Sequence, residues 1–234
     1  MRQDDRKNDE IRKVRFIDDF IDTPLASVLI EMGRTKVLCT VSLEEKVPKF
    51  LLGTGKGWVT AEYSMLPGST STRKVRDISR LKMDGRSTEI QRLIGRSLRS
   101  VMDLHALGER SLIIDCDVLQ ADGGTRTAAI NGAYRALRLA CRRLVDQGVL
   151  EVNPLKGAVG AISAGIVFDE VLSDLNYLED SQAQVDMNVI MDSQGGFIEI
   201  QGTGESRPYT RQEMDTMLTY AESGIRRIFE IQGE

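Results

Sequence analysis

Residues 111–127 read SLIIDCDVLQADGGTRT, an apolar run that leads into two glycines, two threonines and an arginine. Apolar side chains dominate residues 111–119, so this part predicts a buried strand. From the glycine pair to about Gln147, apolar residues recur at helical spacing and predict a helix. The unit is therefore a strand, a tight turn and a helix, and it leaves free backbone N–H groups at the start of the helix.

The turn Asp122–Thr127 carries several groups that can bind phosphate. Its glycines let the backbone approach an anion closely, and the positive end of a helix dipole favours negative charge. Thr125, Thr127 and Arg126 add hydroxyl and guanidinium donors. The spacing is neither GxxxxGK[ST] nor GxGxxG, so it predicts neither an NTPase nor a dinucleotide site. An ordinary glycine-rich turn is the alternative interpretation.

Outward from this unit, strands alternate irregularly with helices. Turn residues and apolar periodicity predict the strands 14–21, 58–63, 157–167, 184–191 and 197–201, and a hairpin of 25–32 with 35–43. Capping-box spacings predict one helix from Thr88 and Gln91 to Gly108 and another from Thr210 and Glu213. The order indicates an α+β fold with mixed sheets. Pro154 suggests a division into two halves, 1–153 and 154–234.

Composition narrows the class of protein. The chain has 234 residues, 41% of them hydrophobic, with 35 acidic and 31 basic side chains, which is typical of a folded protein with a core. No apolar stretch approaches the roughly 20 residues of a membrane helix, so we expect no membrane association. Three scattered cysteines and one histidine disfavour disulfides, zinc sites and Ser–His chemistry, and they indicate the cytoplasm.

Charge is unevenly distributed. Residues 73–99 contain nine Lys and Arg against three Asp and Glu, whereas residues 169–234 contain fourteen acidic residues and four arginines. The basic segment predicts a focused track for a polyanion, with solvated helix faces as the alternative. The stretch 66–85, which overlaps its start, is rich in Pro, Gly, Ser and Thr and is expected to be an exposed loop.

Two acidic residues near the start of a predicted strand form a second candidate site. Asp180 lies shortly before the predicted strand 184–191, and Asp186 lies near the start of that strand. A carboxylate pair of this kind binds Mg²⁺ or transfers a proton. Acidic residues at strand ends are also common without such a function.

Long stretches of the chain resemble the ribonuclease PH family. They are residues 57–63, 85–99, 115–127, 179–188 and 200–203, in the family's order, and the resemblance extends over essentially the whole chain. It implies a fold like domain 2 of ribosomal protein S5 and a phosphorolytic 3′→5′ exoribonuclease. Such an enzyme uses inorganic phosphate to release nucleoside 5′-diphosphates, trims transfer RNA precursors and can add nucleotides in reverse. The resemblance also implies a homohexameric ring, a trimer of dimers.

The resemblance assigns roles to individual residues. Phosphate would be held by Arg86, Gly124, Thr125 and Arg126, and the catalytic acids and Mg²⁺ ligands would be Asp180 and Asp186. RNA contacts are expected from Arg73, Arg76, Arg92, Arg96 and Arg99, which belong to the basic segment. The chain departs from the family pattern at Asp5, where glycine is usual, and at Lys56, where glutamine is common. Alternatives are a non-catalytic RNA-binding ring subunit, a hydrolytic nuclease and a small-molecule kinase of the same fold.

Overall fold

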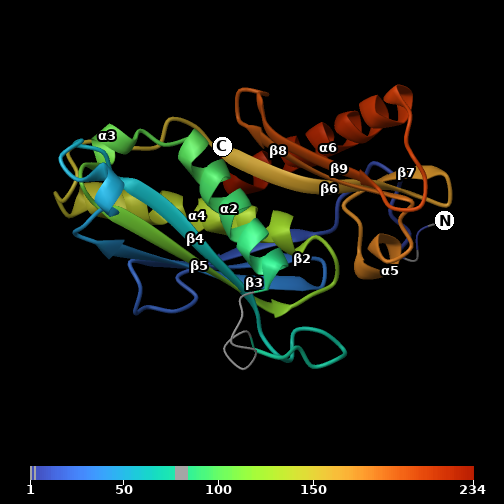
Figure 1. Cartoon of the computed structure of the whole chain (residues 1–234), viewed down its shortest axis with the longest axis horizontal. Helices are drawn as coiled ribbons and strands as arrows, with labels where there is room; N and C mark the ends of the chain where they lie inside the picture. Colours follow the sequence, from blue (N-terminus) through green and yellow to red (C-terminus); the bar gives the residue numbers. More distant parts are fainter. Residues whose placement is uncertain (1, 3, 77–83) are drawn as a thin grey trace.

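The computed structural model describes residues 2, 4–76 and 84–234. These residues form two β-sheets with helices against them (Figure 1). The five-stranded sheet has the order β1-β2-β3-β5-β4, with only β4 and β5 parallel. Its strands are β1 (Val14–Asp18), β2 (Ala26–Met32), β3 (Thr35–Glu44), β4 (Trp58–Met65) and β5 (Ser111–Gln120).

The four-stranded sheet is antiparallel throughout, in the order β7-β6-β8-β9. Its strands are β6 (Val159–Val167), β7 (Glu170–Ser173), β8 (Val185–Asp192) and β9 (Phe197–Gly204). The helices are η1 (Lys49–Leu51), α2 (Gly85–Ser100), α3 (Leu104–Leu107), α4 (Thr125–Asp146), α5 (Tyr177–Asp180) and α6 (Arg211–Gln232). The predicted α+β class with mixed sheets is confirmed.

Helix α4 joins the two sheets into one core. It packs on β2 and β3 on one side and on β6 on the other, and buried apolar residues of both sheets form one cluster around it. Its buried Asn131 donates to the carbonyl of Ala161 (2.9 Å) and accepts from the Ala161 N–H (2.8 Å). β7 pairs with β6 only from Ala164 onward, so this amide serves backbone groups that lack a neighbouring strand there.

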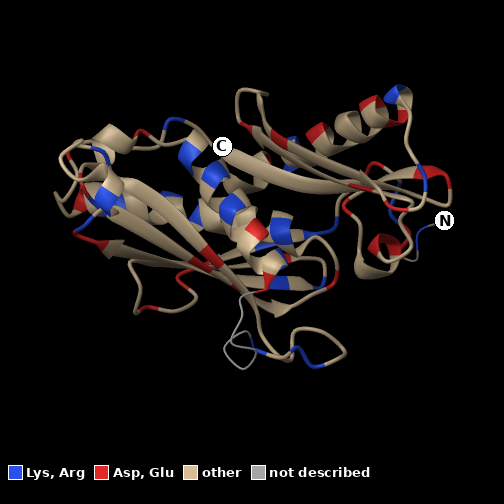
Figure 2. Ribbon diagram, viewed as in Figure 1, with Lys and Arg blue, Asp and Glu red and all other residues tan. Residues whose placement is uncertain are grey.

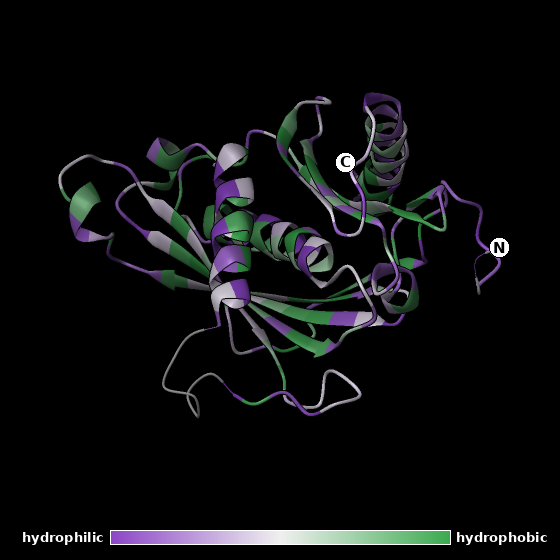
Figure 3. Cartoon of the chain, turned by 45° about the vertical axis from the view of Figure 1, so that its right-hand side comes forward, coloured by the Kyte–Doolittle hydropathy of each residue, from purple (hydrophilic) through white to green (hydrophobic). Residues whose placement is uncertain are grey.

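Apolar stripes place the other long helices. Ile90, Leu93, Ile94 and Leu98 of α2 are buried, and α2 packs against β4. The buried stripe of α6 lies on β6, while polar residues cover its outer side (Figure 3). Apolar periodicity therefore predicted correctly which faces are inside.

Two predicted features of α2 are wrong. The helix is capped by Asp84, whose side chain accepts from the Arg86 N–H, and Thr88 lies inside the first turn with its hydroxyl on the Asp84 carbonyl. The helix also ends at Ser100 and does not continue to Gly108. Met102 forms a bridge with Leu155, which draws the chain away from the helix axis before Asp103 caps α3.

Other local predictions have mixed outcomes. The hairpin of β2 and β3 and the capping box of Thr210 with Glu213 are confirmed. β7 and α5 were not predicted, although Asn176 and Glu179 form a capping box that was visible in the sequence. Residues 77–83 of the predicted exposed loop lie outside the described residues. Within the described part of the chain, no helix has the length and apolarity that crossing a membrane requires.

Candidate active site

One cleft collects all six residues predicted to hold phosphate or to act as acids. Its volume is about 280 Å³, and we call it the central cleft. It is lined by Arg86, Gly124, Thr125, Arg126, Asp180 and Asp186. These residues come from the start of α2, the start of α4, the end of α5 and the start of β8. Elements that are far apart in the sequence thus bring the two predicted sites together.

The turn before α4 presents backbone N–H groups to this cleft. Gly123 and Gly124 have φ angles of +75° and +63°, which favour glycine. A Cβ at Gly123 would also lie 2.5 Å from the carbonyl oxygen of Leu175, so the turn packs directly against the segment that leads into α5. Thr125 is the first residue of α4, and its hydroxyl lies 2.8 Å from the Tyr63 hydroxyl. A turn of this kind, directly before a helix N-terminus, can bind an anion.

Two arginines bring positive charge to the cleft beside this turn. The Arg126 side chain is 17% exposed, and its guanidinium donates to Gln201 at 2.9 Å and lies 3.6 Å from Glu89. Arg86 is the second residue of α2 and is exposed at the rim of the cleft. Because a guanidinium offers several N–H groups in one plane, Arg126 can keep its contacts with Gln201 and Glu89 and still donate to a phosphate oxygen.

The two carboxyl groups have raised pKa values. Burial raises the pKa of Asp180, although Arg86 and Arg126 act in the opposite direction. Burial, together with the charge of Asp180, raises the pKa of Asp186 to about 6. Two carboxylates that repel each other across a cleft attract a proton or a cation.

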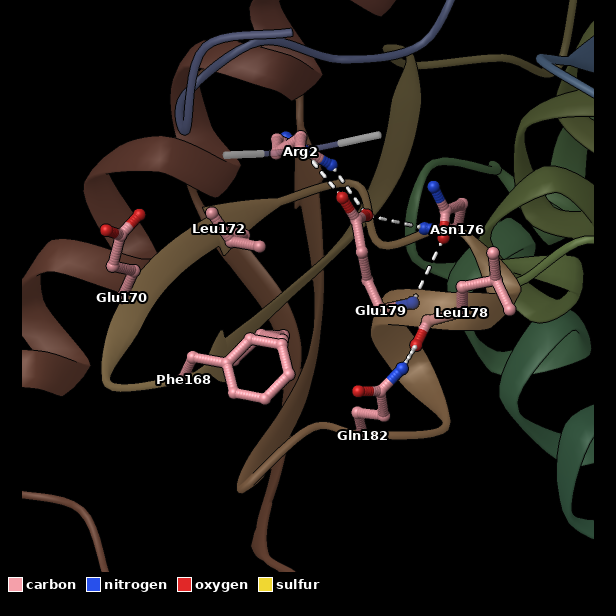
Figure 4. A pocket seen from close by; sticks show the side chains of 9 residues that line it. Arg2, Phe168, Glu170, Leu172, Asn176, Leu178, Glu179 and Gln182 are labelled. Atoms are coloured by element: carbon pink, nitrogen blue, oxygen red, sulfur yellow. Dashed lines mark hydrogen bonds and ion pairs between the residues drawn. The ribbon is translucent and has the colours of Figure 1, made fainter. Parts of the chain in front are cut away.

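An ion pair between Arg2 and Glu179 fixes α5, the short helix that carries Asp180. The Glu179 carboxylate accepts two N–H groups of Arg2, at 2.7 and 2.8 Å, and the backbone N–H of Asn176 at 2.9 Å (Figure 4). The Asn176 side chain in turn accepts from the Glu179 N–H at 3.0 Å. Both side chains of the ion pair are buried. The N-terminus of the chain thereby holds Asp180 at the cleft.

Replacing Asp186 with asparagine is expected to stabilise the folded protein at neutral pH, by about 1–3 kcal/mol. A raised pKa means that the folded state binds the proton more tightly than the unfolded state. The stability from this group is therefore present at acidic pH and is lost as the pH rises through about 6. Urea unfolding at pH 5 and pH 7.5 measures the effect. The gain of Asp186→Asn should shrink at pH 5, and an equal gain at both values would contradict the raised pKa. Asp22→Asn, at an exposed loop position, is the control.

The predicted RNA-contacting arginines of α2 are Arg92, Arg96 and Arg99, and Figure 2 shows several Lys and Arg positions along this helix. Arg92 and Arg96 line a second cleft between α2 and β9, next to Glu89 and Gln201, and Arg96 forms an ion pair with Glu199. Arg99 is turned toward β4, where it donates to the Val59 carbonyl at 2.7 Å and lies 4.3 Å above the Trp58 ring. Arg73 and Arg76 are exposed in the loop before α2.

Sequence reasoning missed several residues of the cleft. Ser163, Asn188 and Glu205 also line it. Asn188 lies two residues after Asp186, on the same face of β8, and this period of two was the signal that could have found it. The negative charge of Glu205 raises the pKa of both acids.

Comparisons with known proteins show which family the chain belongs to. Residues 10–143 match domain 1 of the 3′ exoribonuclease family, and residues 157–224 match domain 2. Ribonuclease PH of Syntrophomonas wolfei is 56% identical over 231 residues, which cover 99% of this chain and 97% of that protein. The chain belongs to the ribonuclease PH family. It is therefore a phosphorolytic 3′→5′ exoribonuclease, a nucleotidyltransferase that acts on RNA with inorganic phosphate as co-substrate.

Solved structures share the fold of this chain. The Archaeoglobus fulgidus exosome with RNA bound to the active site contains a chain with a TM-score of 0.83 at 22% identity, with 98% of this chain and 91% of that chain covered. Rrp46 of rice (Oryza sativa) gives a TM-score of 0.79 at 19% identity, with coverage of 99% and 98%. The expected fold, like domain 2 of ribosomal protein S5, is consistent with both. The division at residue 154 lies between the two matched ranges and stays a prediction.

Proposed function

We propose that the central cleft is the phosphorolytic centre. The supporting observation is that the residues assigned to phosphate and the residues assigned as acids line one cleft. In this proposal Arg86, Arg126 and the turn Gly124–Thr125 bind the attacking phosphate. Asp180 and Asp186 lie where the scissile end of the RNA would enter. A non-catalytic ring subunit has no need of these two sets of residues in one place.

The chemistry balances without an acid from the protein. An oxygen of hydrogen phosphate attacks the phosphorus of the terminal nucleotide, and the bond from that phosphorus to the preceding 3′ oxygen breaks. The nucleoside 5′-diphosphate leaves, and the proton of hydrogen phosphate ends on the 3′ oxygen of the shortened RNA. Because one phosphoanhydride bond replaces one phosphodiester bond, the reaction can run in reverse and extend RNA. The protein must offset the repulsion between two anions, which is the task of Arg86 and Arg126.

The acids fit a Mg²⁺ site. Among the described residues no group of three or more His, Cys, Asp and Glu side chains could hold a metal, but Mg²⁺ commonly uses one or two carboxylates together with substrate phosphates and water. The pKa of Asp186 is raised partly by the charge of Asp180, a repulsion that a cation would relieve. Bound there, Mg²⁺ would add positive charge beside the departing 3′ oxygen. Asp180 and Asp186 would hold it.

The basic segment is the proposed path of the RNA toward the cleft. Arg73, Arg76, Arg92 and Arg96 lie before or along α2, whose first turn carries Arg86. Arg99 is less suited to this role, because it already has backbone and aromatic partners on β4. We propose transfer RNA precursors with 3′ extensions as the substrates, since a single-stranded end must thread past these arginines.

The double variant Arg73→Ala/Arg76→Ala is expected to weaken RNA binding and its salt dependence. Each phosphate contact on a single strand contributes about 0.7 to the slope of log K against log salt, so the slope should fall by about 1.4. Titration of a labelled single-stranded RNA at several salt concentrations measures it. The control is Arg15→Ala/Arg211→Ala, which removes two exposed arginines elsewhere. A slope equal to that of the control would show that the loop with Arg73 and Arg76 does not contact the RNA.

We further propose a homohexameric ring in the cytoplasm. Exposed apolar side chains, among them Phe50, Leu52 and Phe168, support burial against other subunits. The free cysteines support a reducing compartment. Sedimentation of the purified protein tests the ring.

Product analysis tests the proposed centre. The protein is incubated with Mg²⁺ and an RNA that has a short single-stranded 3′ tail, with and without inorganic phosphate. Nucleoside diphosphates that form only with phosphate, and that disappear in Asp186→Asn and Arg126→Ala, would support the proposal. Nucleoside monophosphates without phosphate would indicate hydrolysis. RNA retention without product would indicate a binding subunit.

A further inference from the structure

Residues that do not line the central cleft form hydrogen bonds with the backbone of the proposed phosphate turn. The Thr35 hydroxyl, at the start of β3, donates to the Gly123 carbonyl at 2.7 Å and accepts from the Asp122 N–H at 2.9 Å. Arg12 donates to the Asp122 carbonyl at 2.6 Å. Thr35 and Arg12 are both buried. One hydroxyl and one guanidinium thus fix the backbone of Asp122 and Gly123.

A buried carboxylate fixes Arg12 in turn. Asp174 is fully buried and accepts from the Arg12 side chain at 2.6 and 2.9 Å and from its backbone N–H at 2.7 Å. Burial raises the pKa of Asp174, but the charge of Arg12 and its hydrogen bonds outweigh this, so that the pKa lies below its usual value. The guanidinium therefore stays charged and correctly oriented toward the turn.

Asp174 also connects the phosphate turn with the chain segment that leads to Asp180. Asp174 is two residues before Asn176, the cap of α5, which ends at Asp180. Gly123 packs against the intervening backbone, with room for no side chain. The phosphate turn and the helix of Asp180 therefore rest on one common support.

We propose that Thr35, Arg12 and Asp174 are positioning residues that set the turn 122–124 in its anion-binding conformation before phosphate arrives. This inference rests on the proposed role of the turn in binding phosphate. Without the support, the turn would adopt the binding conformation in only a fraction of molecules. The apparent affinity for phosphate is then the intrinsic affinity multiplied by that fraction, whereas the chemistry in the occupied site does not change.

Thr35→Val tests this directly, because valine keeps the shape of threonine and removes the hydroxyl. The phosphate concentration for half-maximal phosphorolysis should rise about tenfold, as expected for unpaired groups in a buried turn. The rate at saturating phosphate and the affinity for RNA should stay within about twofold. Thr35→Ser retains the hydroxyl and should restore the phosphate response. Thr40→Val, on the opposite face of β3, is the matched control.

Arg12→Lys provides a second variant that keeps the charge. A lysine cannot bridge Asp174 and the Asp122 carbonyl as a guanidinium does, so half-saturation by phosphate should again rise, by at least as much as in Thr35→Val. All rates are measured well below the unfolding temperature of each variant.

An unchanged half-saturating concentration in both variants would overturn the inference, as would a loss of maximal rate alone or equal behaviour of Thr35→Ser and Thr35→Val. A wild-type protein that releases no nucleoside diphosphate in response to phosphate would instead contradict the proposed centre.

Discussion

Arg126→Ala is expected to lower the rate of phosphate-dependent RNA shortening by about 10²–10³-fold, the effect of removing one preorganised donor from a charged transition state. Its guanidinium is held between Gln201 and Glu89 at the wall of the central cleft. In the variant, Glu89 would keep its negative charge close to the phosphate site without the opposing arginine. Both effects disfavour a second anion beside the RNA phosphodiester.

The affinity for RNA should change by no more than about threefold, since the proposed RNA path lies mainly along other arginines. Rates over a range of phosphate concentrations, together with RNA titrations, separate the two quantities. Arg142→Ala is the matched control, because Arg142 is exposed on the same helix, away from its first turn. Equal losses in RNA affinity and in phosphate-dependent rate would show that Arg126 serves RNA binding and not phosphate.

Asp174→Ala is expected to destabilise the fold by about 3–5 kcal/mol, the usual cost of leaving one partner of a buried ion pair without the other. Arg12 would remain buried with no carboxylate, and Arg6, whose guanidinium lies 3.5 Å from the same carboxylate, would lose a partner too. Because the pKa of Asp174 is lowered in the folded state, its contribution to stability is present at neutral pH. That contribution is lost as the pH falls through the folded-state pKa.

Urea unfolding of the single variants and the double variant gives the coupling energy. Arg12→Ala/Asp174→Ala should be less destabilised than the sum of the two single variants, since it removes both charges of the pair. Strictly additive losses would mean that the two side chains do not act as a pair. Asp22→Asn again serves as the exposed control.

Local sequence patterns predicted most of the secondary structure and the chemistry of each segment. Hydrophobic periodicity depends only on nearby residues, so the buried faces of α2 and α6 and the hairpin of β2 with β3 were correct. The start of α2 was wrong because Asp84 and Thr88 both have side chains that cap helices, and only the path of the chain decides between them. The end of α2 depends on a bridge between Met102 and Leu155, a contact across 53 positions that no local pattern contains.

The sequence by itself indicated which residues could hold phosphate and which could act as acids. Local chemistry pointed to the glycine turn with Arg126 and to the two carboxylates, and the resemblance to the ribonuclease PH family added Arg86. Only the tertiary structure decided that Arg86, Arg126, Asp180 and Asp186 share one cleft. It also separated Arg99, whose guanidinium packs on β4, from Arg92 and Arg96, although helical spacing alone gives all three one face. The supporting roles of Thr35, Arg12 and Asp174 were also visible only in the tertiary structure. They depend on hydrogen bonds between residues 87 to 162 positions apart, and folding alone brings those groups together.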